Sequence, residues 1–380
     1  MRIVVATDSF KESLTSLEAG EAIREGIAAV DPEAHVDVRP LADGGEGTAE
    51  ALALGLGGRL EKVSVTGPLG KKVEAAYGIL PDGVAVVEMA EAAGIGLVSP
   101  AERNPYRATT FGVGELLRHA LEKGCRRFIV GIGGSATNDG GAGMLMALGV
   151  QFLTAEGREI SLGAEGLRDL CEIRIDDVLP ELANASFRVA CDVENPLCGA
   201  KGCSAVYGPQ KGATAESVAQ MDQWLADYAK LTQKTFPHAD PNFPGAGAAG
   251  GLGFGFLAYT HATLESGVNI VLEETKLEDY IKDADLVITG EGRLDAQTMM
   301  GKAPFGVAKL AKKHHKPVLA FAGAVTRDAR ELNAHGIDAF FPILRSVSTL
   351  EEALDRKNAR QNMRDAAEQV MRLIHTGIRR

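Results

Sequence analysis

The sequence predicts an α/β fold in which a doubly wound parallel-sheet domain carries an inserted mixed α/β domain. Strand and helix patterns alternate at both ends of the chain, short strands joined by tight turns fill the middle, and 380 residues are too many for one ordinary core. We expect residues 1–62 and 280–380 to form the Rossmann- or flavodoxin-like domain and 63–279 to form the insertion. The active site is expected in the cleft between the two domains. The membership of residues 105–150 stays open.

The N-terminal region alternates strand and helix. Ile3–Ala6 has the apolar run of a buried strand, and Ser16–Val30 is a predicted helix. That helix is preceded by Thr15 and has Glu18 three residues later, which is the spacing of a capping box. A second strand and helix follow, at His35–Leu41 and Gly47–Leu54.

The last hundred residues repeat this rhythm. Apolar runs predict three strands, at Leu286–Thr289, Val318–Ala322 and Ala339–Ile343. Periodic patterns predict three helices, at Pro304–His314, Arg327–Ala334 and Asn358–Ile374. Such alternation is typical of a parallel sheet with ligands at the carboxyl ends of its strands.

The middle of the chain has the pattern of antiparallel strands. Three short strands are expected, the last two joined by the turn Pro81-Asp-Gly83: Lys62–Val65, Val73–Leu80 and Ala85–Met89. Further expected elements are two helices, a hairpin and a strand: Thr110–Lys123, Ala142–Leu148, the turn Thr154–Gly157 and Phe187–Asp192. Gly245–Gly255 is rich enough in glycine to be predicted as a loop.

Composition narrows the classes of function. A formal charge of -11 argues against nucleic acid or an anionic membrane as a partner, and the chain has no apolar stretch long enough to cross a bilayer. The five cysteines include no C-x-x-C pair, which favours reduced thiols over a zinc site. No signal-peptide pattern precedes the first strand, so a cytoplasmic location is expected.

Three segments combine glycine with acidic residues directly behind short apolar runs: Leu41–Thr48, Gly131–Gly141 and Thr289–Asp295. Glycine lets the backbone come close to a polyanion, and its N–H groups can then point at phosphate. Acidic side chains would repel phosphate unless a divalent cation lies between them. The combination therefore favours a Mg-nucleotide site, with tight strand-to-helix turns as the alternative.

The order of the motifs resembles the bacterial glycerate kinase family over the whole chain. The motifs are Asp8–Ser13, Ala42–Thr48, Gly131–Gly141, Cys191–Leu197, Tyr207–Gly212, and Gly290–Asp295 followed by Gly301–Pro304. The resemblance implies ATP-dependent phosphorylation of D-glycerate in glyoxylate and sugar-acid catabolism, a Mg²⁺ requirement and two α/β domains. The 2-hydroxyl is the implied acceptor, with the 3-hydroxyl possible. The expected protein is a monomer or a homodimer. One departure is Ala6 in Ala6-Thr7-Asp8, where relatives usually carry proline before the aspartate.

A kinase of this type needs a carboxylate to orient the attacking hydroxyl and cations to hold anionic groups. Asp192 follows an apolar strand and is the predicted general base, with an Asx turn as the alternative. Lys11 and Arg293 are predicted to hold the glycerate carboxylate, although an ordinary ion pair between Arg293 and Asp295 is the simpler interpretation. The full predicted substrate set is Asp8, Ser9, Lys11, Asp43, Gly44 and Arg293.

The predicted ATP-binding residues come from two of the glycine-rich segments. They are Gly133, Gly134, Ser135, Thr137, Asn138, Gly290 and Glu291, and the predicted Mg²⁺ ligands are Asp43 and Asp295. The chain has no Walker-type G-x-x-x-x-G-K-[ST], so it would not be a P-loop kinase. Arg103, Arg107 and Lys211 either line the cleft or are solvated.

Two other functions stay open on the sequence. Gly131-x-Gly133-x-x-Ala136 resembles a dinucleotide fingerprint, which suggests an NAD-dependent oxidoreductase of small hydroxy acids. That function requires an acidic residue at the end of the next parallel strand, and Glu156 has about the right spacing but lies in an expected hairpin turn. The second alternative is a non-catalytic sugar-acid sensor on the same two domains.

Overall fold

The structure is a computed structural model and describes residues 1–299 and 301–377. The chain divides by its contacts into two compact units. Unit 1 comprises Met1–Asp43, Leu54–Leu56 and the chain from Val268 on, and unit 2 comprises Gly44–Ala53 and Gly57–Gly267. These borders differ from the expected ones at residues 62 and 279, and they place residues 105–150 in unit 2. Both units hold parallel strands flanked by helices, so the predicted α/β class is confirmed.

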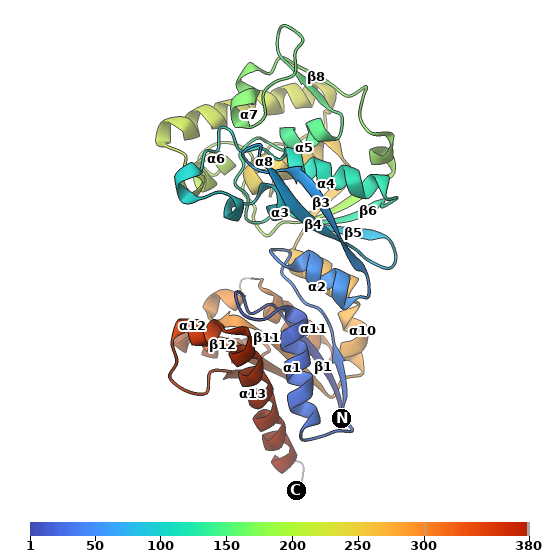
Figure 1. The fold of residues 1–380 in the computed structure, drawn as a ribbon, viewed down its shortest axis with the longest axis vertical. Coiled ribbons are helices and arrows are strands. Elements are labelled where there is room, and N and C mark those ends of the chain that lie inside the picture. The colour runs from blue at the N-terminus through green and yellow to red at the C-terminus, as the bar shows by residue number, and fades with distance from the viewer. Residues whose placement is uncertain (300, 378–380) are drawn as a thin grey trace. The chain divides into compact units, whose positions relative to one another are not determined.

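In its described part, unit 1 is built on a five-stranded sheet whose neighbouring strands are all parallel (Figure 1). The strands, in sheet order, are β13 (Ala339–Pro342), β12 (Val318–Val325), β11 (Leu286–Leu294), β1 (Arg2–Thr7) and β2 (His35–Val38). The β1 residues Ile3, Val4 and Val5 are all fully buried, which explains the unbroken apolar run.

Helices precede, connect or follow the strands of this sheet along the chain. They are α1 (Ser16–Ala28), α9 (Gly267–Glu274), α10 (Leu277–Lys282), η6 (Ala296–Met299), α11 (Ala303–Lys313), η7 (Arg327–His335), α12 (Leu350–Leu354) and α13 (Arg356–Gly377). The capping box at α1 is confirmed, since the Thr15 and Glu18 side chains bond each other's backbone N–H groups. Helices α1 and α13 lie side by side (Figure 1) and share apolar residues such as Ile23 and Met363.

One prediction for unit 1 was wrong. The glycine-acid segment after Thr289 is not a loop, because Glu291–Leu294 continues β11 and pairs with β12. Its glycines allow close backbone packing instead of a turn: a Cβ at Gly290 would lie 2.3 Å from the carbonyl oxygen of Phe321. The helix predicted at 327–334 is present as a 3-10 helix, η7.

Unit 2 has a mixed six-stranded sheet and a two-stranded one. The larger sheet runs β10 (Ala262–Glu265), β9 (Ser186–Ala190), β6 (Arg127–Gly131), β5 (Val84–Glu88), β4 (Lys72–Ile79) and β3 (Arg59–Thr66). Its β3–β4–β5 part is antiparallel and its β5–β6–β9–β10 part is parallel. Strands β7 (Gln151–Leu153) and β8 (Glu172–Arg174) form the small antiparallel sheet.

The α-helices that lie wholly or mostly in unit 2 are α2 (Thr48–Gly55), α3 (Ala90–Ala93), α4 (Phe111–Glu122), α5 (Ala142–Ala147), α6 (Cys203–Tyr207), α7 (Ala215–Thr235) and α8 (Ala248–Tyr259). Its 3-10 helices are η1 (Ile95–Leu97), η2 (Pro100–Glu102), η3 (Ala164–Asp169), η4 (Pro180–Asn184) and η5 (Pro209–Lys211). Across residues 1–299 and 301–377, no helix combines the length and the apolar character that crossing a bilayer requires.

The loop expected at residues 245–255 is mostly helix α8. Ala249, Gly250 and Gly251 have positive φ values of 53°, 69° and 90°, so a left-handed kink lies inside the helix. Glycine is used here for close packing, because a Cβ at Gly250 would lie 2.0 Å from the Thr137 carbonyl oxygen. Glycine content alone does not distinguish this arrangement from a loop.

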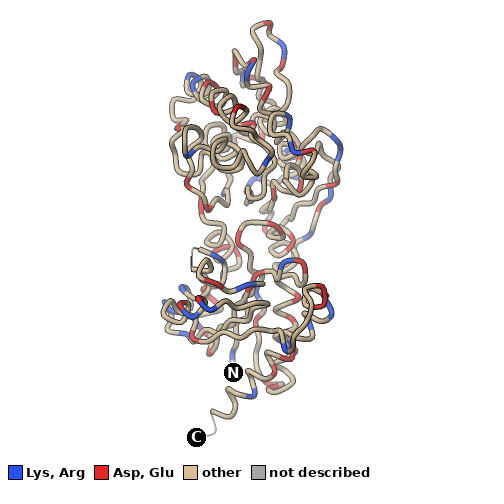
Figure 2. The backbone as a smooth tube through the Cα atoms, turned by 90° about the vertical axis from the view of Figure 1, so that its left-hand side faces the viewer, with Lys and Arg blue, Asp and Glu red and all other residues tan. Residues whose placement is uncertain are grey.

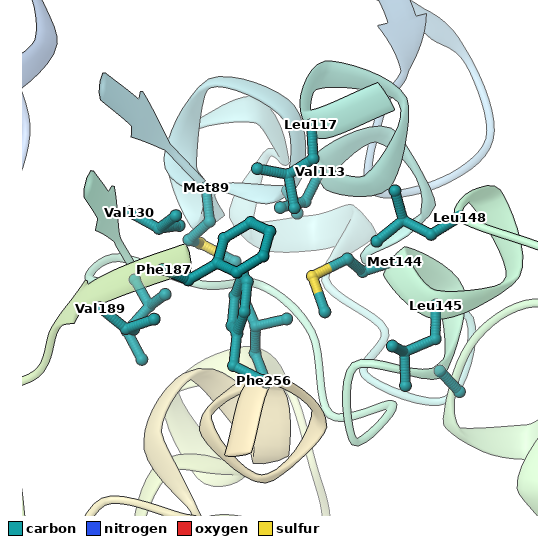
Figure 3. Close-up of a cluster of buried hydrophobic side chains, with 14 of the residues drawn as sticks. Met89, Val113, Leu117, Val130, Met144, Leu145, Leu148, Phe187, Val189 and Phe256 are labelled. Atoms are coloured by element: carbon teal, nitrogen blue, oxygen red, sulfur yellow. The ribbon is translucent and has the colours of Figure 1, made fainter. Parts of the chain in front are cut away.

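The core of unit 2 lies between its larger sheet and the helices. In Figure 3, Phe187 of β9 lies next to Phe256 of α8, and their ring centroids are 5.7 Å apart. Met89 and Met144 fill the space beside these rings (Figure 3), and both are fully buried. This core supports the ends of β5, β6 and β9, where several predicted site residues lie.

Charged residues of both signs are interspersed along the tube in each unit (Figure 2). The formal charge of -11 is therefore spread over the chain and not gathered in one segment.

Candidate active site

In unit 1, carboxylates gather at the carboxyl end of the parallel sheet. Asp8 directly follows β1, and its N–H donates to the Gly290 carbonyl at 2.8 Å. The Asp8 side chain is buried, with Oδ1 accepting from the Ser9 N–H at 2.7 Å. Burial, with the negative charges of Asp43 and Glu291, raises the pKa of Asp8 to about 7. Two other predicted site residues, Asp43 and Glu291, thus lie within electrostatic reach of Asp8.

Glu291 is buried near the end of β11 and is held by two partners that sequence reasoning missed. Its Oε1 accepts from Thr298 Oγ1 at 2.7 Å, and its Oε2 accepts from Lys302 Nζ at 3.3 Å. Burial raises the pKa of Glu291, and the bond from Thr298 opposes that shift. Lys302 Nζ also lies 3.9 Å from Asp295 Oδ1. Lys302 lies in the motif Gly301–Pro304, which is part of the family resemblance. The sequence did not indicate what Lys302 itself does.

The two cations predicted to hold glycerate are both exposed. The Arg293 Nε atom lies 3.3 Å from Asp295 Oδ2 with 65% of the arginine side chain exposed, so the simpler ion pair is present. Lys11 is exposed, and its charge lowers the pKa of Asp8 slightly against the larger effect of burial. Ser9 is half-buried beside Asp8.

In unit 2, the glycine-rich segment Gly131–Gly141 links the end of β6 to α5. Gly133 and Gly134 are exposed at its tip, whereas Ser135, Thr137 and Asn138 are buried. The backbone is held from α3 and η1: the Ala136 N–H donates to Ala93, and the Ile95 N–H donates to Gly134. The five residues of this segment that were predicted to bind the nucleotide therefore separate into an accessible tip and a buried support.

Two side chains in this support have unmatched oxygens. Thr137 Oγ1 and Asn138 Oδ1 are buried and have no hydrogen-bond partner among the described residues, while Asn138 Nδ2 donates to Ser204 Oγ at 2.8 Å. Asp139, which sequence reasoning left without a role, is fully buried and accepts from the N–H groups of Thr110, Gly141 and Gly143. Burial raises its pKa, and the hydrogen bonds from Thr110 oppose this. Its position indicates that it fixes the loop.

Lys211 was left between a cleft role and a solvated one, and the structure excludes solvation. It is 2% exposed, and Nζ donates to Ser135 Oγ and to the Thr137 carbonyl. Arg103 is half-buried and donates to the Gln210 carbonyl at 3.2 Å, whereas Arg107 is exposed. A buried lysine cannot be recognised from sequence because its burial depends on distant segments.

Glu88, the last residue of β5, is another residue that sequence reasoning missed. Its carboxylate accepts from the N–H groups of Gly47 at 3.1 Å and Ala49 at 2.7 Å, at the start of α2. Burial raises the pKa of Glu88 to about 7, although these two bonds lower it. The signal available in the sequence was an acidic residue at the end of an apolar strand. Glu88 thus anchors the segment that contains Gly44.

Asp192 lies two residues beyond β9, which ends at Ala190 and not at Asp192 as predicted. It is exposed, and Oδ1 accepts from the Gly267 N–H at 3.3 Å. The neighbouring parallel strands β5, β6 and β9 therefore lead into Glu88, the glycine-rich segment and Asp192 at one edge of the sheet. This arrangement offers backbone donors for an anion and an accessible carboxylate for a proton.

Among the described residues, no group of three or more His, Cys, Asp or Glu side chains is arranged to hold a metal ion. The acidic residue required for a dinucleotide site is not Glu156. That residue is exposed in a turn bonded to Thr154, next to β7, which pairs antiparallel with β8. The oxidoreductase interpretation therefore loses Glu156 as its acidic residue for the dinucleotide.

Comparison with known proteins extends this picture. The profile described as "Glycerate kinase family" matches residues 3–375. A glycerate kinase of Haemophilus influenzae is 47% identical over 98% of this chain and 99% of its own length. A glycerate 2-kinase of Escherichia coli K12 is 46% identical, covering 100% of this chain and 99% of its own length. A crystal structure from Salmonella typhimurium LT2, assigned as glycerate kinase 2, has a TM-score of 0.92 at 47% identity and 100% coverage of both chains.

Proposed function

Because the chain belongs to the glycerate kinase family, we propose that it transfers a phosphoryl group from ATP to the 2-hydroxyl of D-glycerate. Kinase activity with ATP as donor follows from the family, and the sensor and oxidoreductase alternatives have no comparable support. The 2-position is supported by the similarity to the Escherichia coli glycerate 2-kinase, and 3-phosphoglycerate is the alternative product. A role in glyoxylate or sugar-acid catabolism belongs to the same proposal.

The observation that best supports this proposal is the exposed tip of the glycine-rich segment at the end of a parallel strand. Gly133 has open space where a Cβ would stand, and Gly134 has a φ of 73° that disfavours side chains. Backbone N–H groups at such a tip can approach phosphate closely. We assign the ATP phosphates to Gly133 and Gly134, with Ser135, Thr137 and Asn138 as their support. Gly290 and Glu291 remain further nucleotide candidates.

We assign glycerate to the residues after β1 and β2 together with Arg293. Lys11 and Arg293 are exposed cations with reach for a carboxylate, and the Arg293 fork can exchange Asp295 for the substrate. Asp8, Ser9, Asp43 and Gly44 supply acceptors and donors for hydroxyl groups. The acidic groups select for a hydroxylated substrate because a second carboxylate would be repelled.

The oxygen ligands of unit 1 fit Mg²⁺, which is usually bound by one or two carboxylates plus phosphates and water. Of the two predicted ligands, Asp43 fits better, because it lies within electrostatic reach of Asp8 and a cation would relieve that repulsion. Asp295 already neighbours Arg293 and Lys302. Asp43 would hold the ion, which would supply positive charge to neutralise the charge that develops on the phosphates.

Asp192 is the proposed general base. Its carboxylate would take the proton of the glycerate hydroxyl while that oxygen bonds to the γ-phosphorus and the bond to ADP breaks. The Gly267 N–H donates to one of its carboxylate oxygens and so helps to hold the side chain in place.

The product test is a coupled assay with purified protein, ATP and D-glycerate. Enolase alone should consume the product if it is 2-phosphoglycerate, whereas 3-phosphoglycerate requires added mutase. Consumption only with mutase would overturn the 2-hydroxyl assignment. ADP formation that is independent of glycerate would contradict the assignment of glycerate as the substrate.

The site test uses Gly133→Ala, since among residues 1–299 and 301–377 a Cβ there meets no atom within 4 Å beyond its own chain neighbours. The fold should be unchanged and the KM for ATP should rise about tenfold, because the added group obstructs the phosphate. Gly96→Ala in the same unit also has open space and serves as the matched control. An unchanged KM for ATP in Gly133→Ala would remove the nucleotide from this segment.

A further inference from the structure

Lys211 is a buried cation behind the glycine-rich segment. It ends η5, is 2% exposed, and reaches that segment with its ammonium group. Nζ donates to Ser135 Oγ at 2.7 Å and to the Thr137 carbonyl oxygen at 2.6 Å. One side chain thus holds two positions of the segment, one through a hydroxyl and one through the main chain.

The charge of this lysine is costly for the fold. Within the described residues Lys211 forms no ion pair, and its surroundings include Leu69, Ile95 and Val98. Burial lowers the pKa of Lys211 to about 8, which reports the same cost. An apolar side chain of similar size would fill this space without the desolvation penalty. Packing alone therefore does not account for an ammonium group here.

The bond to Ser135 has a consequence for the serine hydroxyl. Because the oxygen accepts from Lys211, the hydroxyl hydrogen is free to donate in another direction. A bond from a cation also polarises the hydroxyl and strengthens it as a donor. Ser135 adjoins the exposed residue Gly134, so an anion at the tip is within its neighbourhood.

We propose that Lys211 is a positioning residue for the nucleotide: it orients the Ser135 hydroxyl as a donor toward a phosphate of ATP and fixes the main chain at Thr137. This inference rests on the proposed function, in which the glycine-rich segment binds ATP. Lys211 itself need not touch the phosphate. The residue that transmits its effect is Ser135.

The test is a double-mutant cycle on the full chain with Lys211→Met and Ser135→Ala. Each single variant should raise the KM for ATP about tenfold, as expected for one lost bond to a charged group, and leave the KM for glycerate unchanged. The double variant should resemble the singles, because both break the same connection. Lys201→Met, an exposed lysine of the same unit, is the matched control.

Three results would overturn the inference: an unchanged KM for ATP in Lys211→Met, additive effects in the double variant, or an altered KM for glycerate alone. If Lys211→Met does not fold, the test rests on Ser135→Ala. An unchanged KM for ATP in Ser135→Ala would then overturn the inference. Gly133→Ala separates the two levels of the proposal. Without an effect in Gly133→Ala the nucleotide assignment itself fails, whereas an effect there with none in Lys211→Met overturns only the role of the lysine.

Discussion

Gly131 and Gly44 are in such close contact that a Cβ at residue 131 would lie 2.4 Å from the carbonyl oxygen of Gly44. The end of β6 is therefore packed against the segment predicted to bind glycerate. Gly44 itself has a φ of 86°, a conformation that side chains disfavour. Two glycine-rich segments that are distant in sequence thus depend on each other's lack of side chains.

Gly131→Ala should displace the segment around Gly44, because the clash is with backbone and no flexible side chain can yield. We expect a loss of stability of about 1–3 kcal/mol, as for overpacked sites, and a raised KM for glycerate. Thermal unfolding and steady-state kinetics check this. The open position Gly133 provides the contrast, since Gly133→Ala should keep its melting temperature. Equal melting temperatures for both variants would contradict the packing described here.

Asp8→Asn should stabilise the free protein at pH 8 while abolishing most activity. The folded-state pKa of Asp8 is raised to about 7 from 3.8, mainly by burial, so the folded state binds more protons than the unfolded state between these values. Wild-type stability therefore falls as pH rises from about 4 to 7. The variant lacks this loss, and its advantage should reach about 1–4 kcal/mol at pH 8 and vanish near pH 4.

The measurement is thermal unfolding without nucleotide or divalent cations at several pH values. Asp338→Asn is a control of opposite sign in the same unit. Burial raises the pKa of Asp338, but its bonds from Lys312 and the Val318 N–H lower it overall. Asp338→Asn should therefore destabilise the protein at pH 8. A pH-independent difference between Asp8→Asn and wild type would contradict the raised pKa.

Glu88→Gln should raise the KM for glycerate several-fold. The glutamine has one acceptor oxygen, so either the Gly47 or the Ala49 N–H loses its bond and the segment ahead of α2 loosens. Glu91→Gln is the matched control, because Glu91 accepts only the Ala76 N–H within the described contacts and lies on α3. Steady-state kinetics with glycerate varied at saturating ATP distinguishes the two. Identical constants in both variants would remove Glu88 from the support of the substrate segment.

Asp192→Asn should lose most turnover, on the order of a hundredfold or more, with little change in the KM for ATP. The asparagine can still accept from the Gly267 N–H, so the fold should persist. Activity measured across pH 6–9, with the melting temperature as a check on folding, tests this. Turnover near the wild-type rate would refute the role of general base.

Much of the fold follows from local patterns. Strands such as Ile3–Ala6 are buried on both faces and therefore appear as unbroken apolar runs. The capping box at Thr15 and the turn at Pro81–Gly83 are local signals that survive in the structure. Glycine misled at two positions, because at Gly250 and Gly290 it serves close packing and not a turn.

The candidate site was harder to predict, for a different reason. Of the aspartates predicted at strand ends, Asp8 directly follows β1, whereas Asp192 lies two residues beyond β9. The supporting residues Glu88 and Lys211 have roles that depend on segments 41 and 76 positions away in sequence. Burial and unmatched charge arise only when the chain is folded, so no pattern within one segment announces them.

The continuation of β11 beyond Thr289 makes the site unusually sensitive to length. Successive residues of a strand face opposite sides, so Glu291 and Arg293 share one side while Gly292 and Leu294 take the other. Inserting a single residue ahead of Glu291 would exchange the two sides, turning the acid and the guanidinium away together and exposing Leu294 in their place. Evolution or engineering can therefore alter the chemistry here by substituting residues, but inserting or deleting a single residue would erase it.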